Sequence, residues 1–233
     1  MKQKIISHIS YLLGKNSELG KTFKDKIEFQ KRREELDFWL DRFSKNGGVK
    51  YWRDLYFQLY CHFLCIDKDY FKNKILMDIG CGPHGVLDYF DAKFKIGIDP
   101  LVDFYKKELG LSNSISNKYI ACGGEDIPLP DESVDAIMSR NALDHVDNVE
   151  GTFKEIHRLL KKDGEVVFAI NYQYEPTVCE PHVLTDETID NLLKNLFNYK
   201  IIKKYPAYYD AKIGDKNQFV YPHEIVTITG TKK

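Results

Sequence analysis

Residues 74–85 have the sequence KILMDIGCGPHG, and this stretch decides the fold. An apolar run that starts at Ile75 leads into a loop with glycines at positions 80, 82 and 85. Glycine permits positive φ angles and lets a ligand approach the backbone closely. A buried strand that leads into such a loop and then into a helix is typical of nucleotide-binding α/β domains. The stretch therefore predicts a strand, a ligand-binding loop and the start of a helix.

Further apolar runs follow this stretch at intervals that fit helices. The clearest intervening helix has Phe153, Ile156 and Leu159 on one face. Two lysines and Gly164 behind it are helix stop signals. Strands that alternate with helices predict an α/β fold with a doubly wound, mostly parallel sheet and right-handed crossovers. The predicted strands after the first are residues 94–98, 119–122, 134–138 and 166–170.

The N-terminal part of the chain has a different pattern. Apolar side chains recur at helical spacing in residues 36–43 and again in residues 52–63, which predicts two amphipathic helices. A Gly-Gly pair separates them at positions 47–48. We expect these helices to pack on the α/β region, with Tyr51, Trp52 and Arg53 as part of a lid over its ligand site.

The C-terminal part adds one more helix and two strands. Thr185 is a suitable N-cap for the helix, and the β-rich runs 199–209 and 218–229 are suited to antiparallel pairing. No linker-like composition interrupts the chain. We predict a helical extension or lid over residues 1–70 and a cofactor-binding catalytic domain over residues 71–233.

The overall composition excludes several classes of protein. The 233 residues contain 34 Lys and Arg and 35 Asp and Glu, a net charge of −1. A non-specific nucleic-acid binder usually carries a positive excess, so we expect no nucleic-acid partner. No apolar run approaches the roughly 18 residues that cross a bilayer, and the first residues do not resemble a secretion signal. We expect a cytoplasmic protein without a membrane partner.

The five cysteines do not suggest a disulfide framework or a metal centre. Their number is odd and their spacing is sparse, unlike the cysteine pattern of small secreted domains. Cys61, His62 and Cys65 lie close in sequence, but no further ligands follow at metal-binding spacing. We expect reduced thiols and no metal site.

Two ligands compete for the glycine loop. Glycines 80, 82 and 85 satisfy the G-x-G-x-x-G pattern of dinucleotide sites, and Asp78 begins a D-x-G-x-G pattern typical of S-adenosylmethionine sites. A dinucleotide places its pyrophosphate on free N–H groups at a helix N-terminus. Pro83 removes one such donor, and Asp78 adds negative charge nearby. S-adenosylmethionine carries a sulfonium and an ammonium cation instead, so it is the predicted cofactor, with NAD as the alternative.

Asp99 is the predicted ribose-binding residue. It ends the second strand, 19 residues after Gly80, where a carboxylate accepts hydrogen bonds from ribose hydroxyls. This position suits either cofactor. The other interpretation is a turn-forming role before Pro100.

A family resemblance appears once these motifs are combined with residues 122–139. Their sequence, CGGEDIPLPDESVDAIMS, resembles the A-E-D-L-P-F-P-D-x-S-F-D stretch of class I S-adenosylmethionine-dependent methyltransferases. With the glycine loop and Asp99, the resemblance covers roughly residues 70–171. It implies a Rossmann-like sheet of seven strands with an antiparallel strand near one edge. It also implies S-adenosylmethionine as cofactor and methyl transfer as the activity.

The resemblance implies ten cofactor-binding residues in the loops and strand ends of this region. They are Asp78, Gly80 and Gly82 for the methionine end, Asp99 for the ribose, Gly124, Glu125, Asp126 and Ile127 for the adenine, and Ser139 and Asn141 near the sulfonium. Two positions depart from the family pattern. Gly124 stands where small non-glycine residues are commoner, and His84 stands where a small residue is common. We expect His84 to face solvent.

Two histidines are candidate catalytic bases. Methyl transfer from a sulfonium is a direct displacement, so alignment of the reacting atoms matters most, but an alcohol nucleophile must also lose a proton. His145, next to Asp144, follows the fourth strand, and His182, near Glu180, follows the fifth. Both loops project toward the ligand edge of an open α/β sheet. The other interpretation is that either histidine packs against or leads into a helix.

The predicted acceptor is a small molecule, such as a sugar or a biosynthetic metabolite. Residues 1–50 hold 12 basic and 7 acidic residues, which suits an anionic substrate or a solvated helix face. Alternative functions are an NAD-dependent oxidoreductase, a non-catalytic cofactor-binding subunit, and methylation of RNA or protein. Residues 139–142 read Ser-Arg-Asn-Ala and lack the Asn-Pro-Pro-aromatic tetrad of amino-group methylation, which weakens DNA-base and glutamine methylation. The sequence specifies neither the acceptor nor the oligomeric state.

Overall fold

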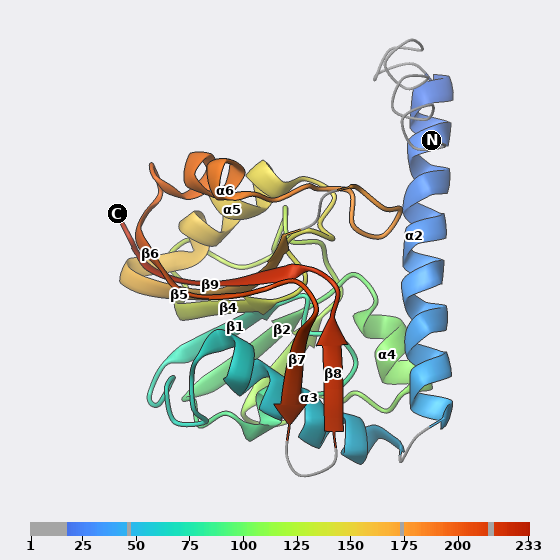
Figure 1. Ribbon diagram of the computed structural model, residues 1–233, viewed down its shortest axis with the longest axis horizontal. Helices are drawn as coiled ribbons and strands as arrows, with labels where there is room; N and C mark the ends of the chain where they lie inside the picture. Colours follow the sequence, from blue (N-terminus) through green and yellow to red (C-terminus); the bar gives the residue numbers. More distant parts are fainter. Residues whose placement is uncertain (1–17, 46–47, 173–174, 214–216) are drawn as a thin grey trace.

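The computed structural model describes residues 18–45, 48–172, 175–213 and 217–233 (Figure 1). The first helices along the chain are α2 (Glu18–Lys45) and α3 (Gly48–Leu64). Between the later strands lie a 3-10 turn (Val86–Tyr89), α4 (Val102–Glu108), α5 (Val149–Leu159) and α6 (Asp186–Leu193). The strands of the main sheet are β1 (Ile75–Ile79), β2 (Phe94–Ile98), β3 (Asn117–Ile120), β4 (Val134–Arg140), β5 (Leu160–Tyr172), β6 (Phe197–Tyr205) and β9 (Glu224–Lys232).

The order of the seven strands confirms the predicted sheet. It runs β3-β2-β1-β4-β5-β9-β6. The first five strands are mutually parallel, and β9 pairs antiparallel with both β5 and β6. The strand order reverses between β1 and β4, where the carboxyl ends of adjacent strands diverge into separate loops. This reversal is the usual ligand site of a doubly wound sheet.

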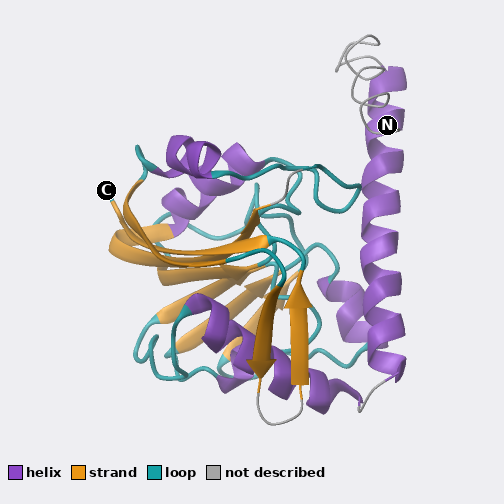
Figure 2. Ribbon diagram, in the orientation of Figure 1, coloured by secondary structure: helices purple, strands orange, loops and turns teal. Residues whose placement is uncertain are grey.

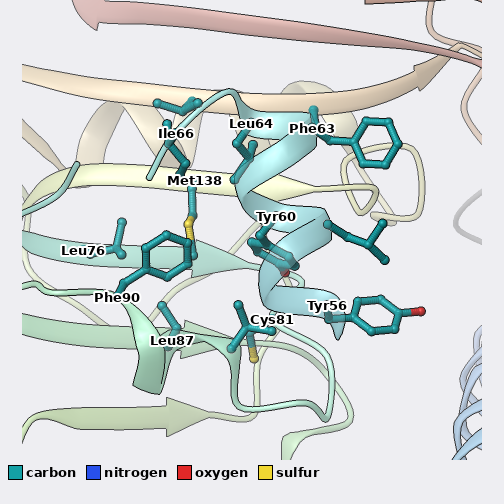
Figure 3. Packing of buried hydrophobic residues seen from close by; sticks show 14 of the residues in the cluster. Tyr56, Tyr60, Phe63, Leu64, Ile66, Leu76, Cys81, Leu87, Phe90 and Met138 are labelled. Atoms are coloured by element: carbon teal, nitrogen blue, oxygen red, sulfur yellow. The ribbon is translucent and has the colours of Figure 1, made fainter. Parts of the chain in front are cut away.

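Helices cover both faces of the sheet (Figure 2). On one face, α5 and α6 pack on alternate residues of the strands, such as Met77 and Ile137. On the other face, α3 packs on Leu76 and Met138, together with the 3-10 turn and α4. Figure 3 shows this second core, in which Tyr60 of α3 lies among side chains from the sheet. Successive side chains of a strand point to opposite faces of the sheet, so neighbouring residues of each strand belong to two separate cores.

Helix α3 is part of the main hydrophobic core. Its Leu59, Tyr60, Phe63 and Leu64 are at most 1% exposed and share a cluster with strand residues. Trp52 is also buried and donates its indole N–H to the Arg42 carbonyl. A boundary near residue 70 therefore does not coincide with a break in packing.

The prediction of an α-helix after the glycine loop is wrong. The loop is followed only by the 3-10 turn, with Gly85 at φ +67° as its N-cap. Val86, Leu87 and Phe90 are buried in the core that α3 shares. Because α3 already covers this face of the sheet, a single turn is enough to return the chain to β2.

The C-terminal prediction is confirmed for one pairing and incomplete for the rest. The two β-rich runs do pair, as β6 with β9. Between them lies a hairpin that the sequence analysis missed, β7 (Tyr209–Ile213) with β8 (Asn217–Tyr221), which forms a second sheet. Pro206 precedes the hairpin and Pro222 follows it. Proline has no backbone N–H to donate, so the hydrogen bonding between neighbouring strands is interrupted at these two positions.

Two helix ends test the stop and start signals. Helix α5 ends at Leu159, earlier than the predicted lysine and glycine signals, because Leu160 already pairs with Val134 as part of β5. Helix α6 begins as predicted, with Thr185 as its N-cap. The Thr185 hydroxyl accepts from the Thr188 N–H, and the Thr188 hydroxyl accepts from the Thr185 N–H in return.

None of the helices in the described part of the chain combines the length and the apolar character needed to cross a lipid bilayer.

Candidate active site

A cavity of about 650 Å³ lies at the carboxyl ends of β1, β2 and β4. One wall is α2, which stands along the side of the domain where these strands end (Figure 1). Helix α3 and the β7–β8 hairpin supply further walls, through Tyr56 and Tyr60 on the helix and Tyr221 on β8. The cavity is thus built jointly by the sheet and by elements at both ends of the chain.

The glycine loop forms the floor of this cavity and requires its glycines. Gly80 and Gly82 have φ angles of +71° and +58°. A Cβ atom on Gly80 would lie 2.2 Å from the Ala142 Cβ, and one on Gly82 would lie 2.7 Å from the His84 ring. Both contacts are too short to exist, so each position requires glycine.

Asp99 presents a carboxylate to the cavity beside this loop. It accepts hydrogen bonds from the N–H of Gly82 at 3.2 Å and of Leu101 at 2.9 Å. Burial raises the pKa of Asp99 to about 6; the nearby Glu35 also raises it, and the two N–H donors hold it down. The carboxylate is fixed in place and is ionised at neutral pH.

The structure brings six of the ten predicted cofactor-binding residues to the cavity wall. They are Gly80, Gly82, Asp99, Gly124, Glu125 and Asn141. Glu125 has a structural role, because its carboxylate accepts hydrogen bonds from the N–H groups of Asp147 and Asn148 at 2.7 Å each. It therefore holds the loop that precedes α5.

The other four predicted residues lie off the cavity wall. Asp126 is exposed, and Ile127 is buried in the core on the α5 side. Ser139 is buried and donates its hydroxyl to the Ile79 carbonyl at 2.8 Å. Asp78 is fully buried and faces α3, where the Tyr60 hydroxyl donates to it at 3.0 Å.

The buried Asp78 carboxyl carries an unsatisfied oxygen. Its Oδ1 has no hydrogen-bond partner among the described residues. Burial raises the pKa of Asp78 well above its usual range, although the Tyr60 hydrogen bond and Arg140 act in the opposite direction. A cation near this carboxyl would favour its ionised form.

The residues present fit S-adenosylmethionine better than a dinucleotide. Asp99 can accept from ribose hydroxyls, and the Asn141 Oδ1 is buried without a partner among the described residues, so it can accept from an ammonium group. Residues 80–89 contain one 3-10 turn and no α-helix. The dipole of an α-helix N-terminus that would receive a pyrophosphate is therefore missing from this loop.

His145 lies in the cavity wall among carboxylates. Its Nδ1 is 3.2 Å from Glu35 of α2, and its Nε2 is 3.6 Å from Glu180 and 4.0 Å from Asp144. Burial lowers the pKa of His145, but the Glu35 hydrogen bond and the three negative charges outweigh it, and the net shift is upward. The neighbouring carboxylates thus shift His145 toward its imidazolium form.

His182 does not reach the cavity wall. Its Nε2 lies 2.8 Å from the Val146 carbonyl, so this nitrogen carries a proton and donates. The His182 backbone N–H also points to the Asp144 carbonyl at 3.5 Å. These contacts hold the loop that carries His145.

The lid predicted from residues 51–53 has a different role. Trp52 belongs to the core, and Arg53 donates to the His84 carbonyl at 2.8 Å and pairs with Asp88 at 3.3 Å. Tyr51 is partly exposed and does not line the cavity. The covering element is α2, through residues such as Glu35 and Trp39.

His84, expected to face solvent, is 3% exposed and lines the cavity. Its ring stacks on Tyr56 with 3.7 Å between centroids and meets the Trp39 ring edge-on at 4.6 Å. Burial and nearby arginines lower its pKa well below the usual range, so the ring is neutral. Its departure from the family pattern was the one signal in the sequence that marked this position.

Comparison with known proteins identifies the central region. Residues 77–168 match the family model described as a methyltransferase domain. These residues thus form a methyltransferase domain within the chain, and the sheet has the Rossmann-like fold of solved methyltransferases. Solved structures that share the fold of this methyltransferase domain include S-adenosylmethionine-dependent methyltransferases, and S-adenosylmethionine is the cofactor of the family.

Individual relatives match only part of the chain. Sterol 24-C-methyltransferase of Pneumocystis carinii is 27% identical over 112 residues, 44% of this chain and 29% of that protein. Protein arginine N-methyltransferase 1 of Saccharomyces cerevisiae is 41% identical over 81 residues, 31% of this chain and 23% of that protein. The chain thus spans less than a third of these two relatives.

A solved structure of known sequence relationship also shares the fold of most of this chain. The YcgJ protein of Bacillus subtilis superposes with a TM-score of 0.57 at 17% identity, covering 76% of this chain and 98% of that one. At this identity the likeness concerns the fold.

Proposed function

We propose that this protein transfers a methyl group from S-adenosylmethionine to an oxygen or nitrogen atom of a small molecule, such as a sugar or a biosynthetic metabolite. The observation that carries the proposal is that one cavity is lined both by the cofactor-binding loop and by aromatic side chains from α2, α3 and β8. The first set suits the methyl donor and the second suits an acceptor.

The dimensions of the cavity favour a small acceptor. Its volume of about 650 Å³ falls within the range of roughly 300–1,000 Å³ typical of small-molecule sites. Donor and acceptor share this space, and α2 and the β7–β8 hairpin limit the room beside the cofactor. The near-zero net charge of the chain offers no support for a nucleic-acid acceptor.

In this proposal, the residues of the cavity position the methyl donor and the acceptor. When bound, S-adenosylmethionine supplies an electrophilic methyl group on sulfur. Asp99 holds the ribose, the glycine loop contacts the methionine end, and Tyr56 and Trp39 exclude water from the acceptor side. The cavity residues would align the acceptor atom with the methyl group that the cofactor would supply, and a base would take the acceptor's proton. Orientation of these groups accounts for most of the rate enhancement expected of such a site.

His145 stays the predicted base, but the carboxylates around it oppose the neutral form that a base requires. Only its neutral form accepts a proton, and Glu35, Asp144 and Glu180 favour the charged form. His182 has a positioning role, because it contacts the His145 loop and not the cavity.

Calorimetry with S-adenosylmethionine, S-adenosylhomocysteine and NAD tests the cofactor assignment. We expect both adenosyl ligands to bind and NAD not to bind. Binding of NAD alone would contradict the proposal. Methyl-labelled cofactor is then incubated with a metabolite extract and, separately, with protein and RNA fractions. Label in small molecules supports the proposal, label in a macromolecule contradicts the acceptor class, and cofactor binding without transfer points to a non-catalytic subunit.

A further inference from the structure

Arg140 sits at the point where the cofactor loop and the acceptor side of the cavity meet. It is the last residue of β4 and lines the cavity. The alternation of β4 places it on the α3 face, as for Met138. Its guanidinium carbon lies 5.6 Å from the Tyr56 ring centroid, 5.3 Å from that of Phe63 and 5.8 Å from that of Tyr221. Aromatic faces therefore surround this cation.

The guanidinium has no anionic partner among the described residues. Its Nη2 donates to the Tyr221 hydroxyl at 2.9 Å, and its Nε is buried without a hydrogen-bond partner. Arg158, by contrast, pairs with Asp131 and Glu155 at 2.6 Å each. A buried donor that lacks a partner costs stability, so the unpaired Nε is unusual.

Asp78 does not neutralise Arg140. It is close enough for Arg140 to affect its pKa, but burial dominates and the pKa of Asp78 stands well above its usual range. The hydrogen bond that its carboxyl accepts comes from the Tyr60 hydroxyl, and no ion pair joins it to Arg140. Among the described residues, Arg140 therefore forms no ion pair with Asp78 or with any other carboxylate.

Two further groups make the same end of the cavity favourable for an anion. His84 has a buried, neutral ring in which one nitrogen carries a proton, and the Cys81 backbone lies beside this ring. Arg42 of α2 also lines the cavity, with its guanidinium 5.2 Å from the Trp52 ring centroid. Neither Arg42 nor Arg140 forms an ion pair with a described residue.

We propose that the methyl acceptor carries an oxyanion, a carboxylate or phosphate group, and that Arg140 binds it within the ring of Tyr56, Phe63 and Tyr221. Arginine suits this role because its planar fork matches carboxylate and phosphate geometry. The aromatic residues of this site all lie outside residues 77–168, the segment matched by the family model. The proposal rests on the proposed function and adds the substrate class.

The test uses the full chain saturated with S-adenosylhomocysteine, which fills the cofactor part of the cavity. Benzoate, phenyl phosphate and the uncharged benzamide are titrated in by calorimetry. We expect at least one of the two oxyanions to bind about tenfold or more tightly than benzamide, as for a charge-assisted hydrogen bond. Arg140→Gln should abolish the preference, and Arg140→Lys should retain part of it.

Arg33→Gln is the matched control, because it removes the same charge from an exposed residue that pairs with Asp37 outside the cavity. It should leave the preference unchanged. If Arg140→Gln does not fold, Tyr221→Phe replaces it: loss of the hydroxyl that orients Arg140 should reduce the preference severalfold. Equal binding of oxyanions and benzamide, no oxyanion binding, or a preference that survives these variants would overturn the proposal.

A second arm distinguishes the acceptor's oxyanion from the carboxylate of the cofactor. 5′-Methylthioadenosine lacks the amino-acid part of S-adenosylhomocysteine. If Arg140→Gln weakens binding of S-adenosylhomocysteine but not of 5′-methylthioadenosine, Arg140 holds the cofactor's carboxylate and the proposal is wrong. Failure of the wild-type chain to bind S-adenosylhomocysteine contradicts the proposed function, whereas normal binding without an oxyanion preference contradicts only the present inference.

Discussion

Single side chains in the cavity differ mainly in whether their charge is compensated. Asp99 is held by two backbone donors, His145 is surrounded by carboxylates, and Arg140 forms no ion pair with a described residue. The environments of Asp99 and His145 change how these two groups respond to pH. Two predictions follow from the first two residues.

Cofactor affinity should depend on the ionisation of Asp99. Its pKa is raised to about 6 by burial, and only the ionised carboxylate accepts hydrogen bonds from both ribose hydroxyls. Affinity for S-adenosylhomocysteine should therefore be full above this pKa and fall as pH drops through it. Asp99→Asn should weaken binding about tenfold at pH 8 and remove the pH dependence, whereas Asp103→Asn, at an exposed position, should do neither. Calorimetry from pH 5 to pH 8 measures both effects.

Turnover should depend on the neutral form of His145 if it is the base. Its pKa is raised above the ordinary 6.5 by neighbouring carboxylates that outweigh burial, so the rate should increase as pH rises through that higher value. His145→Ala should lower kcat by roughly 10²-fold or more and remove this dependence. His182→Ala should have a smaller effect. Single-turnover rates of His145→Ala equal to those of the wild type would exclude it as the base.

Among the structural elements, the glycine loop and the strands could be predicted, and the cavity walls could not. The loop and strands carry local signals, because positive φ angles and buried strands restrict residue type directly. The β7–β8 hairpin was missed because its short strands merge with β6 and β9 into two long β-rich runs. The role of α2 as a wall depends on where a helix packs, which its own periodicity does not specify. His84 and Arg140 gained their roles from α3, far away in sequence.

Two glycines separate the effect of space from the effect of backbone angle. Gly80 and Gly110 both have positive φ, 71° and 73°. A Cβ on Gly80 would overlap Ala142, whereas one on Gly110 meets nothing within 4 Å. Gly80→Ala should therefore lose cofactor binding and more stability, while Gly110→Ala should cost only about 1 kcal/mol from the backbone angle. Chemical denaturation and calorimetry on both variants test this, and equal losses would contradict it.

At the scale of the whole molecule, the N-terminal part has two different functions. Helix α3 belongs to the core of the sheet, whereas α2 lies against the cavity and is joined to the β4–α5 loop by the Lys31–Asp147 pair at 2.8 Å. The predicted extension over residues 1–70 therefore contains a structural half and a site-forming half.

Truncation should distinguish these two halves. Removal of residues 1–47 takes away α2 and should leave a cooperatively folding domain with weakened cofactor binding. Removal of residues 1–70 also takes away the buried Leu59, Phe63 and Leu64, and loss of one such side chain alone costs about 2–5 kcal/mol. This shorter chain should not fold. Urea denaturation followed by circular dichroism distinguishes the two, and a folded shorter chain would contradict the assignment of α3 to the core.

The aromatic wall of the cavity has an optical consequence. The protein contains two tryptophans: Trp39 lines the cavity, and Trp52 packs against Tyr56, whose ring also lines it. Emission from the native protein therefore originates beside the acceptor. A compound that enters there changes the polarity around Trp39, so unlabelled libraries can be screened by fluorescence alone, before any product has been identified.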